Sequence, residues 1–115
     1  MKSTFVDYVV SDLLADVRGV RARAMFGGHG IYQNDTMFAI IVDDELYYKV
    51  GDGNRRDFET HGSKPFTYKS KGRKPVTMSY WNVPGEVLDD REILMEWTEK
   101  ATSVARMRSI KGGGR

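Results

Sequence analysis

The apolar residues of the first seventeen positions recur at intervals of three and four, which is the spacing of one helical face. Ser3 or Thr4 is the expected N-cap, Thr4 and Asp7 form a near variant of the capping box, and Gly19 is a typical stop. These signals predict an amphipathic helix over residues 3–17. Its apolar positions are Phe5, Val6, Val9, Val10, Leu13, Leu14 and Val17.

From residue 22 to residue 50 the apolar positions alternate with polar ones, as they do in strands that bury one face. Three turn sequences, GGH, Asn34-Asp35 and Asp43-Asp44, divide this stretch. Connections this short join antiparallel neighbours, because a parallel connection needs about a dozen residues or more. Residues 22–50 are therefore predicted to form an antiparallel meander of three or four strands.

The second half of the chain carries the signals of a short helix and of another hairpin. Residues 52–61 predict a mostly exposed helix that starts with an Asp cap and ends at Gly62. Residues 66–69 and 75–83 alternate like strands, and the turn between them is predicted at KGR, residues 71–73.

A last helix is predicted from residue 89, where the sequence DDRE places acids in the first turn, to about residue 108. We expect residues 1–108 to form one domain and residues 109–115 to form a flexible, basic, glycine-rich tail. The order helix, three or four strands, helix, two strands, helix predicts the α+β class. A mainly antiparallel sheet with helices on one face is the expected architecture.

Composition limits the classes of protein to consider. The chain has 115 residues, of which 40% are hydrophobic, and this is enough for one buried core. It has no cysteine, which excludes disulfides, thiolate metal sites and thiol nucleophiles. Its longest apolar runs fall short of the ~20 residues of a membrane span, and its N-terminus lacks the core of a signal peptide. We therefore expect a cytoplasmic protein with no membrane partner.

The formal net charge of +2 hides an uneven distribution of basic residues. Four of the 18 basic residues lie in residues 101–115, which leaves 14 basic against 16 acidic residues in 1–100. Between Thr60 and Gly85 there are five basic residues and no acid, with Phe66 and Tyr68 interleaved. Such a hairpin either contacts nucleic acid or protects an exposed sheet edge with charge. The candidate contacts are Lys64, Lys69, Lys71, Arg73 and Lys74, with Arg106, Arg108, Lys111 and Arg115 of the terminal segment.

The stretch MFGGHGIY, residues 25–32, raises the possibility of a phosphate-binding loop or a metal site. The glycines lead into a strand instead of a helix, and no Lys-Ser/Thr pair follows, so a phosphate cradle is disfavoured. His29 and His61 lack partners at metal-ligand spacing, and Ser79 lies in no nucleophile elbow. We expect no cofactor and no catalytic set, and we interpret the glycines as a bend that allows two strands to pack closely.

The segments ARAMFGGHGIYQNDTMFAIIVDDELYYKV, NRRDFE, KPFTY and VTMSYWNVPGEVLDD resemble the N-terminal domain of the TfoX (Sxy) family. The resemblance covers about residues 10–105 and implies an α+β fold similar to the secretion-chaperone-like class. In that family the full-length regulators carry a second, helical domain and act as coactivators with the cyclic-AMP receptor protein at competence promoters. This chain is similar to a stand-alone N-terminal domain. The signature positions are Met25, Phe26, Gly27, Gly28, Gly30, Tyr32, Ser79, Tyr80 and Trp81, and we expect them to be structural.

We therefore expect a non-enzymatic interaction domain that contacts a protein partner, such as the transcription machinery. The alternative is a weak nucleic-acid-binding protein that uses the hairpin of residues 64–74 and the basic end. A small-ligand-binding domain or an enzyme with a pocket near His29 is the least favoured hypothesis. A homodimer through a free sheet edge is compatible with the predicted architecture.

Overall fold

The computed structural model describes residues 4–25, 27–69 and 71–113. Its strands form one six-stranded antiparallel sheet in the order β1-β2-β3-β4-β6-β5, which confirms the predicted α+β class. The strands are β1 (Val20–Met25), β2 (Gly28–Gln33), β3 (Thr36–Val42), β4 (Glu45–Lys49), β5 (Pro65–Tyr68) and β6 (Val76–Asn82). The helical elements are α1 (Phe5–Asp7), the π-helical segment η1 (Tyr8–Leu13), α2 (Arg55–Thr60), α3 (Gly85–Leu88) and α4 (Arg91–Gly113).

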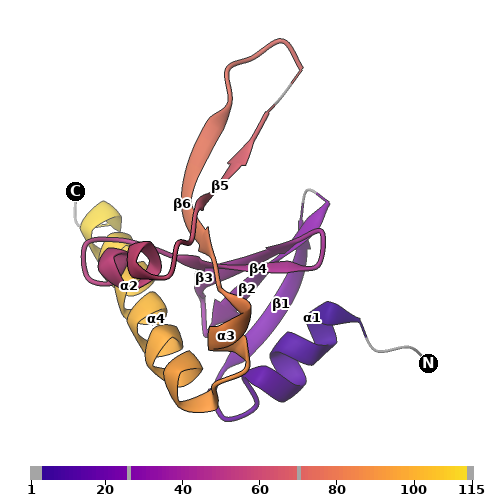
Figure 1. Ribbon diagram of the computed structural model, residues 1–115, viewed down its shortest axis with the longest axis vertical. Coiled ribbons are helices and arrows are strands. Elements are labelled where there is room, and N and C mark those ends of the chain that lie inside the picture. The colour runs from indigo at the N-terminus through magenta and orange to yellow at the C-terminus, as the bar shows by residue number, and fades with distance from the viewer. Residues whose placement is uncertain (1–3, 26, 70, 114–115) are drawn as a thin grey trace.

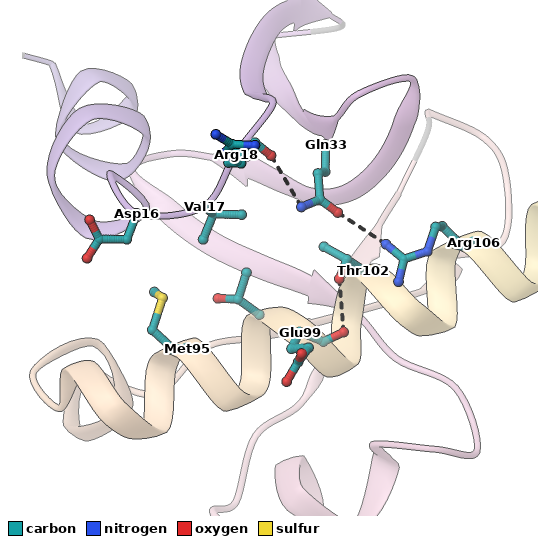
Figure 2. Close-up of a pocket in the computed structure, with 9 residues that line it drawn as sticks. Asp16, Val17, Arg18, Gln33, Met95, Glu99, Thr102 and Arg106 are labelled. Carbon is teal, nitrogen blue, oxygen red and sulfur yellow. Dashed lines mark hydrogen bonds between the residues drawn. The ribbon is translucent and has the colours of Figure 1, made fainter.

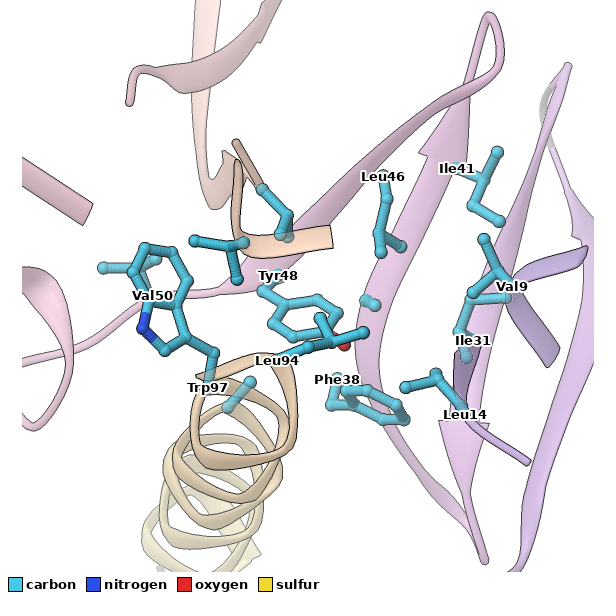
Figure 3. Packing of buried hydrophobic residues seen from close by; sticks show 14 of the residues in the cluster. Val9, Leu14, Ile31, Phe38, Ile41, Leu46, Tyr48, Val50, Leu94 and Trp97 are labelled. Carbon is cyan, nitrogen blue, oxygen red and sulfur yellow. The ribbon is translucent and has the colours of Figure 1, made fainter. Parts of the chain in front are cut away.

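The helices pack against one face of the sheet, and among the described residues no helix covers the other face (Figure 1). Phe38 and Tyr48 from the middle strands and Leu94 and Trp97 from α4 meet in the core (Figure 3). Each of these four side chains is at most 4% exposed, and Phe38 and Tyr48 are fully buried. The core therefore lies between α4 and strands β3 and β4, as the prediction of helices on one face requires.

The turns of the meander follow local sequence chemistry. Asp43 and Asp44 both have positive φ, at 51° and 59°, and they connect the register partners Val42 and Glu45. A two-residue hairpin loop with two positive φ angles matches the right-handed twist of its strands, and Asn and Asp tolerate this conformation best. Asn34, with φ of 56°, begins the turn between β2 and β3. Both turns were predicted correctly.

The N-terminal helix differs from its prediction. The capping box is present, because the Thr4 side chain accepts a hydrogen bond from the Asp7 backbone at 3.0 Å. After α1, however, the chain widens into η1, and the Leu14 backbone N–H donates to the Val9 carbonyl over five residues at 2.9 Å. The prediction of a regular helix to residue 17 was wrong. The wider turn brings Val9 and Leu14 onto one side, where both are buried.

The helices of the second half differ from the prediction in three respects. Asn54, not Asp52, occupies the N-cap of α2, and it makes no side-chain cap hydrogen bond. The four-residue helix α3 was not predicted, because it begins directly after Pro84 and is too short to show a periodicity. α4 continues to Gly113, beyond the predicted end at residue 108.

The predicted second hairpin is present as β5 and β6, and it joins the sheet through pairing of β6 with β4. Its outer part extends away from the helices and from the other strands (Figure 1). We call residues 64–82 the arm.

Candidate functional site

The face of the sheet opposite the helices carries an apolar groove of about 600 Å³ between the arm and strands β1–β3. We call it the open-face groove. It is lined by Met25, Gly28, His29, Met37, Ile40, Val42, Phe66, Tyr68 and Met78. Ile40 is only 7% exposed although it lies on this face of the sheet. Three flexible methionines make such a surface adaptable to the shape of a ligand.

A β-bulge in β3 gives the groove its lining. The register between β2 and β3 shifts from Ile31–Ala39 to Tyr32–Met37, so Phe38 has no direct partner. Phe38, Ala39 and Ile41 belong to the core, whereas Met37, Ile40 and Val42 line the groove. A strand without the extra residue would place Phe38 and Ile40 on the same face. The sequence alternation alone did not predict this exchange of faces.

The glycine stretch at the start of β2 is a hairpin turn followed by a close approach of two strands. Gly27 has a φ of +80° and lies in the short connection between Met25 and its register partner Gly28. A Cβ added at Gly28 would lie 2.4 Å from the Ile41 carbonyl oxygen, which is shorter than any tolerable contact. A Cβ at Gly30 would lie 2.7 Å from the Met37 sulfur. This geometry matches the predicted glycine bend, and it leaves room for the methionines on the groove floor.

The arm carries the basic cluster that the sequence singled out. Lys64, Lys69, Lys71, Arg73 and Lys74 are all exposed. At its outer end Tyr68 and Val76 are register partners, and each is 46% exposed. Further in, Phe66 contacts Tyr47 with ring centroids 5.0 Å apart and so connects the arm to β4.

The structure does not bring Arg106 to the arm. Arg106 donates a hydrogen bond to the Gln33 side chain at 3.1 Å, and Gln33 donates to the Arg18 carbonyl at 3.3 Å (Figure 2). Arg106 is therefore held at Gln33, and the alternative of a nucleic-acid contact through the hairpin and the basic end stays a prediction. The side chains of Arg108 and Lys111, and the whole of Arg115, lie outside the described residues.

These bonds belong to a second, polar pocket of about 410 Å³ between α4 and the segment before β1, which sequence reasoning missed. Its lining comes from three segments far apart in the chain, and no motif links them. The lining residues are Asp16, Val17, Arg18, Gln33, Met95, Thr98, Glu99, Thr102 and Arg106.

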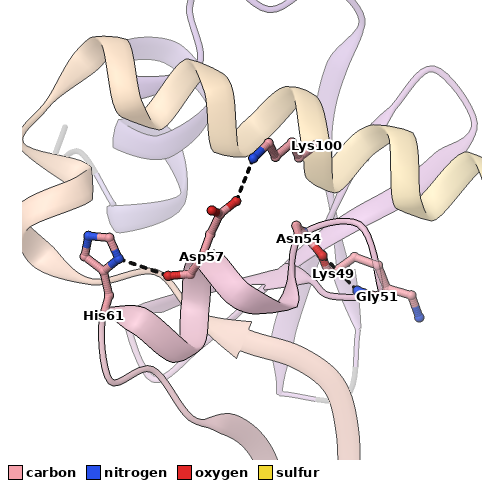
Figure 4. A network of polar contacts seen from close by, with 6 residues as sticks. All are labelled: Lys49, Gly51, Asn54, Asp57, His61 and Lys100. Carbon is pink, nitrogen blue, oxygen red and sulfur yellow. Dashed lines mark hydrogen bonds and ion pairs between the residues drawn. The ribbon is translucent and has the colours of Figure 1, made fainter.

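The two histidines lie in different surroundings. His29 lines the open-face groove, whereas His61 lies between Glu86, at 3.5 Å, and the ring of Trp97. The His61 ring nitrogen Nδ1 also lies 2.9 Å from the Asp57 carbonyl oxygen (Figure 4). Within residues 4–25, 27–69 and 71–113, no three His, Asp or Glu side chains gather as a metal site would require. In the same ranges no helix is long and apolar enough to span a membrane.

The TfoX N-terminal domain matches residues 12–105 of this chain. The chain belongs to the TfoX family. Both the open-face groove and the arm lie inside the matched residues, whereas Arg106 and Arg108 lie beyond them.

Two relatives show how this TfoX domain compares with longer proteins. Over 76 residues the chain is 32% identical to Protein Sxy of Escherichia coli K12, covering 66% of this chain and 36% of the relative. Over 61 residues it is 34% identical to DNA transformation protein TfoX1 of Aliivibrio fischeri, covering 53% of this chain and 29% of the relative. The chain thus spans about a third of the length of the curated relatives it matches.

The positions that were expected from the sequence to form the family signature fall into two groups. Met25, Gly27, Gly28 and Gly30 lie at or close to the β1–β2 turn, Tyr32 lies further along β2, and Phe26 lies outside the described residues.

Ser79, Tyr80 and Trp81 form the second group in β6, where it pairs with β4. The Ser79 hydroxyl accepts a hydrogen bond from the Lys49 side chain at 2.8 Å. The ring centroids of Trp81 and Phe58 lie 6.4 Å apart. The Tyr80 ring is 6% exposed, and burial, with a contribution from Tyr32, raises the pKa of Tyr80 to about 12.

Proposed function

We propose that this TfoX domain is a non-catalytic protein-interaction domain that acts in the control of DNA uptake and transformation competence. Membership of the family supports the process, since one relative is named DNA transformation protein TfoX1. The open-face groove supports the mode of action, because it is an apolar surface on the side of the sheet that the helices leave uncovered.

The occupant we propose for the groove is an amphipathic helix of a protein partner. A volume of about 600 Å³ holds a few large side chains, and a methionine-rich groove suits the apolar face of a helix. An exposed apolar surface of this kind on a water-soluble domain marks an interaction site more often than it marks an accident of packing.

The charges around the groove favour a partner helix with acidic flanks. Tyr32 lies beside Gly30, next to the lining methionines Met25 and Met37. The guanidinium groups of Arg21 and Arg23 lie 5.3 and 6.0 Å from the Tyr32 ring centre, and Arg21 also pairs with Asp35 at 3.3 Å, which leaves Arg23 as the main attracting cation on this side. On the opposite side, Lys69 follows Tyr68 along the arm. Cations on two sides of an apolar groove attract a helix whose polar face carries carboxylates and repel a basic one.

The test is transcription of the competence genes in the organism that encodes this chain. We expect transcript levels to fall when the gene is replaced by the double variant Met25→Gln and Met37→Gln. These substitutions keep the side-chain length but place amides on the apolar floor. The matched control is Met107→Gln, because Met107 is 61% exposed on α4 and lies outside the groove lining.

Purified variants are first compared by thermal melting, so that a loss of folding is recognised. A fall in transcripts with the groove variant, together with an unchanged control, supports the proposal. Unchanged transcripts after deletion of the whole gene would overturn the role in competence. Unchanged transcripts with the folded groove variant would overturn the groove as the contact surface.

A further inference from the structure

We propose that the arm binds duplex nucleic acid through its outer loop, independently of the sequence of the duplex. This goes beyond the protein contact at the open-face groove. Tyr68 and Lys69 border both surfaces, whereas Lys71, Arg73 and Lys74 belong to the arm alone. Four cations, Lys69, Lys71, Arg73 and Lys74, lie within six positions of the arm, and all four side chains are exposed. Between Thr60 and Gly85 the sequence has no acidic residue that could neutralise them.

Protection of a sheet edge does not account for the position of these cations. The outermost register pair of the arm is Tyr68 with Val76, and all four cations lie beyond it, in the connection between β5 and β6. An edge strand is protected by charges that lie along its paired length. Of the five arm cations, Lys64 alone is adjacent to the paired part of β5 on its inner side.

The shape of the arm fits a polyanion of large diameter. The arm extends away from the helices and the other strands, so its outer loop can approach a duplex without a clash with the body of the domain (Figure 1). In the described part of the chain, none of the four cations is engaged in a salt bridge. Phosphate groups can therefore contact them without first displacing a carboxylate.

Tyr68 and Val76, the register pair next to the outer loop, supply a second feature of duplex-binding hairpins. Tyr68 and Val76 face each other across the arm, and each is 46% exposed. Proteins that insert a β-ribbon or an arm into a groove of DNA combine cations for the phosphates with apolar side chains against sugars and base edges. The arm has both in adjacent positions.

The experiment measures fluorescence anisotropy of a labelled duplex of random sequence with the full chain over a salt series. Four phosphate contacts predict that log K falls with log salt at a slope of about −3 to −4. The double variant Lys71→Glu and Arg73→Glu is expected to weaken binding at least about tenfold at low salt and to reduce the slope by about two.

The matched control reverses two charges elsewhere on the surface. Arg55 and Arg56 are exposed on α2, and the variant Arg55→Glu and Arg56→Glu has the same net charge as the arm variant. We expect it to bind within about twofold of the unaltered chain at moderate salt, where long-range effects of net charge are screened. Equal weakening by both variants would overturn a specific role of the arm.

A competition assay separates a duplex from an acidic protein. An unlabelled duplex should displace the probe at a much lower concentration of negative charge than poly-glutamate does. Equal displacement by poly-glutamate would assign the arm to acidic polypeptides and overturn the proposal, as would the absence of duplex binding at low salt. Because the groove variant Met25→Gln and Met37→Gln leaves the arm cations intact, it should bind the duplex normally.

Discussion

The hydroxyl groups of Tyr48 and Thr98 lie 2.6 Å apart in the core and connect strand β4 to helix α4. Thr98 also donates to the Leu94 carbonyl at 2.7 Å, so its hydroxyl accepts from Tyr48 while it donates within its own helix. Tyr48 is fully buried and Thr98 is 2% exposed. Both hydroxyl groups thus have hydrogen-bond partners in the apolar core. The bond between them fixes the rotation of α4 relative to the sheet.

We expect Thr98→Val to destabilise the fold by about 1–3 kcal/mol, because it leaves the Tyr48 hydroxyl buried without a partner. Tyr48→Phe should cost less, since Thr98 keeps its bond to Leu94. Urea unfolding of the purified variants measures both values. Thr98→Ser retains the hydroxyl and is the matched control. A loss of stability in Thr98→Ser as large as that in Thr98→Val would attribute the effect to packing instead of the hydrogen bond.

Replacement of Gly28 by valine should lower the melting temperature. The added side chain would begin 2.4 Å from the Ile41 carbonyl oxygen, and backbone atoms of a paired strand cannot move away cheaply. Overpacking of this kind costs about 1–3 kcal/mol or more. Gly85→Ala is the control, since a Cβ at Gly85 meets nothing within 4 Å. An unchanged melting temperature for Gly28→Val would remove the structural account of this glycine.

Stability should fall at alkaline pH in part through Tyr80. Burial raises the pKa of Tyr80 from 10.0 to about 12, so the folded state holds the proton more tightly than the unfolded state. The stabilisation is complete below pH 10 and is lost as the pH rises towards 12, by at most about 3 kcal/mol.

Denaturant unfolding at several values between pH 8 and pH 12 measures this loss. In Tyr80→Phe the free energy of unfolding should fall less between pH 10 and pH 12 than in the unaltered chain. Some loss should remain, because burial also raises the pKa of Tyr48. If the unaltered chain and Tyr80→Phe lose stability in parallel, the Tyr80 hydroxyl is not the group that titrates.

Asn54 should matter more for stability than the predicted cap residue Asp52. Its side chain accepts from the Gly51 backbone at 2.8 Å and donates to the Lys49 carbonyl at 2.9 Å, and it is 2% exposed (Figure 4). Asn54→Ala leaves these backbone groups unpaired, and we expect a cost of about 2 kcal/mol by urea unfolding.

Asp52→Ala is the comparison for Asn54→Ala, because the Asp52 carboxylate is fully exposed and pairs with Arg55 at 3.5 Å only at the surface. Its expected effect lies within about 0.5 kcal/mol. If Asp52→Ala proved as costly as Asn54→Ala, the helix cap predicted from the sequence would be the better account of this loop.

The candidate surfaces differ in how much of them could be predicted. The basic cluster of the arm is contiguous in the sequence, so the sequence alone places Lys71 and Arg73 on one surface. The open-face groove is assembled from β1, β2, β3 and the arm, and its lining depends on the bulge at Phe38. No local pattern predicts a bulge in an apolar run such as MFAIIV, because every side chain in it can lie on either face of the sheet.

The sequence by itself determined the features that depend on neighbouring residues. These are the capping box of Thr4 and Asp7, the turns at Asn34 and at Asp43-Asp44, and the strands between them, because backbone preferences and hydrogen bonds over three or four residues decide them. The tertiary structure alone decided the π-helical turn at Val9, the pairing of β6 with β4 and the uncovered face with its groove. Each of these arises from packing between segments far apart in the chain, where burial of apolar surface outweighs the local preference of any single residue.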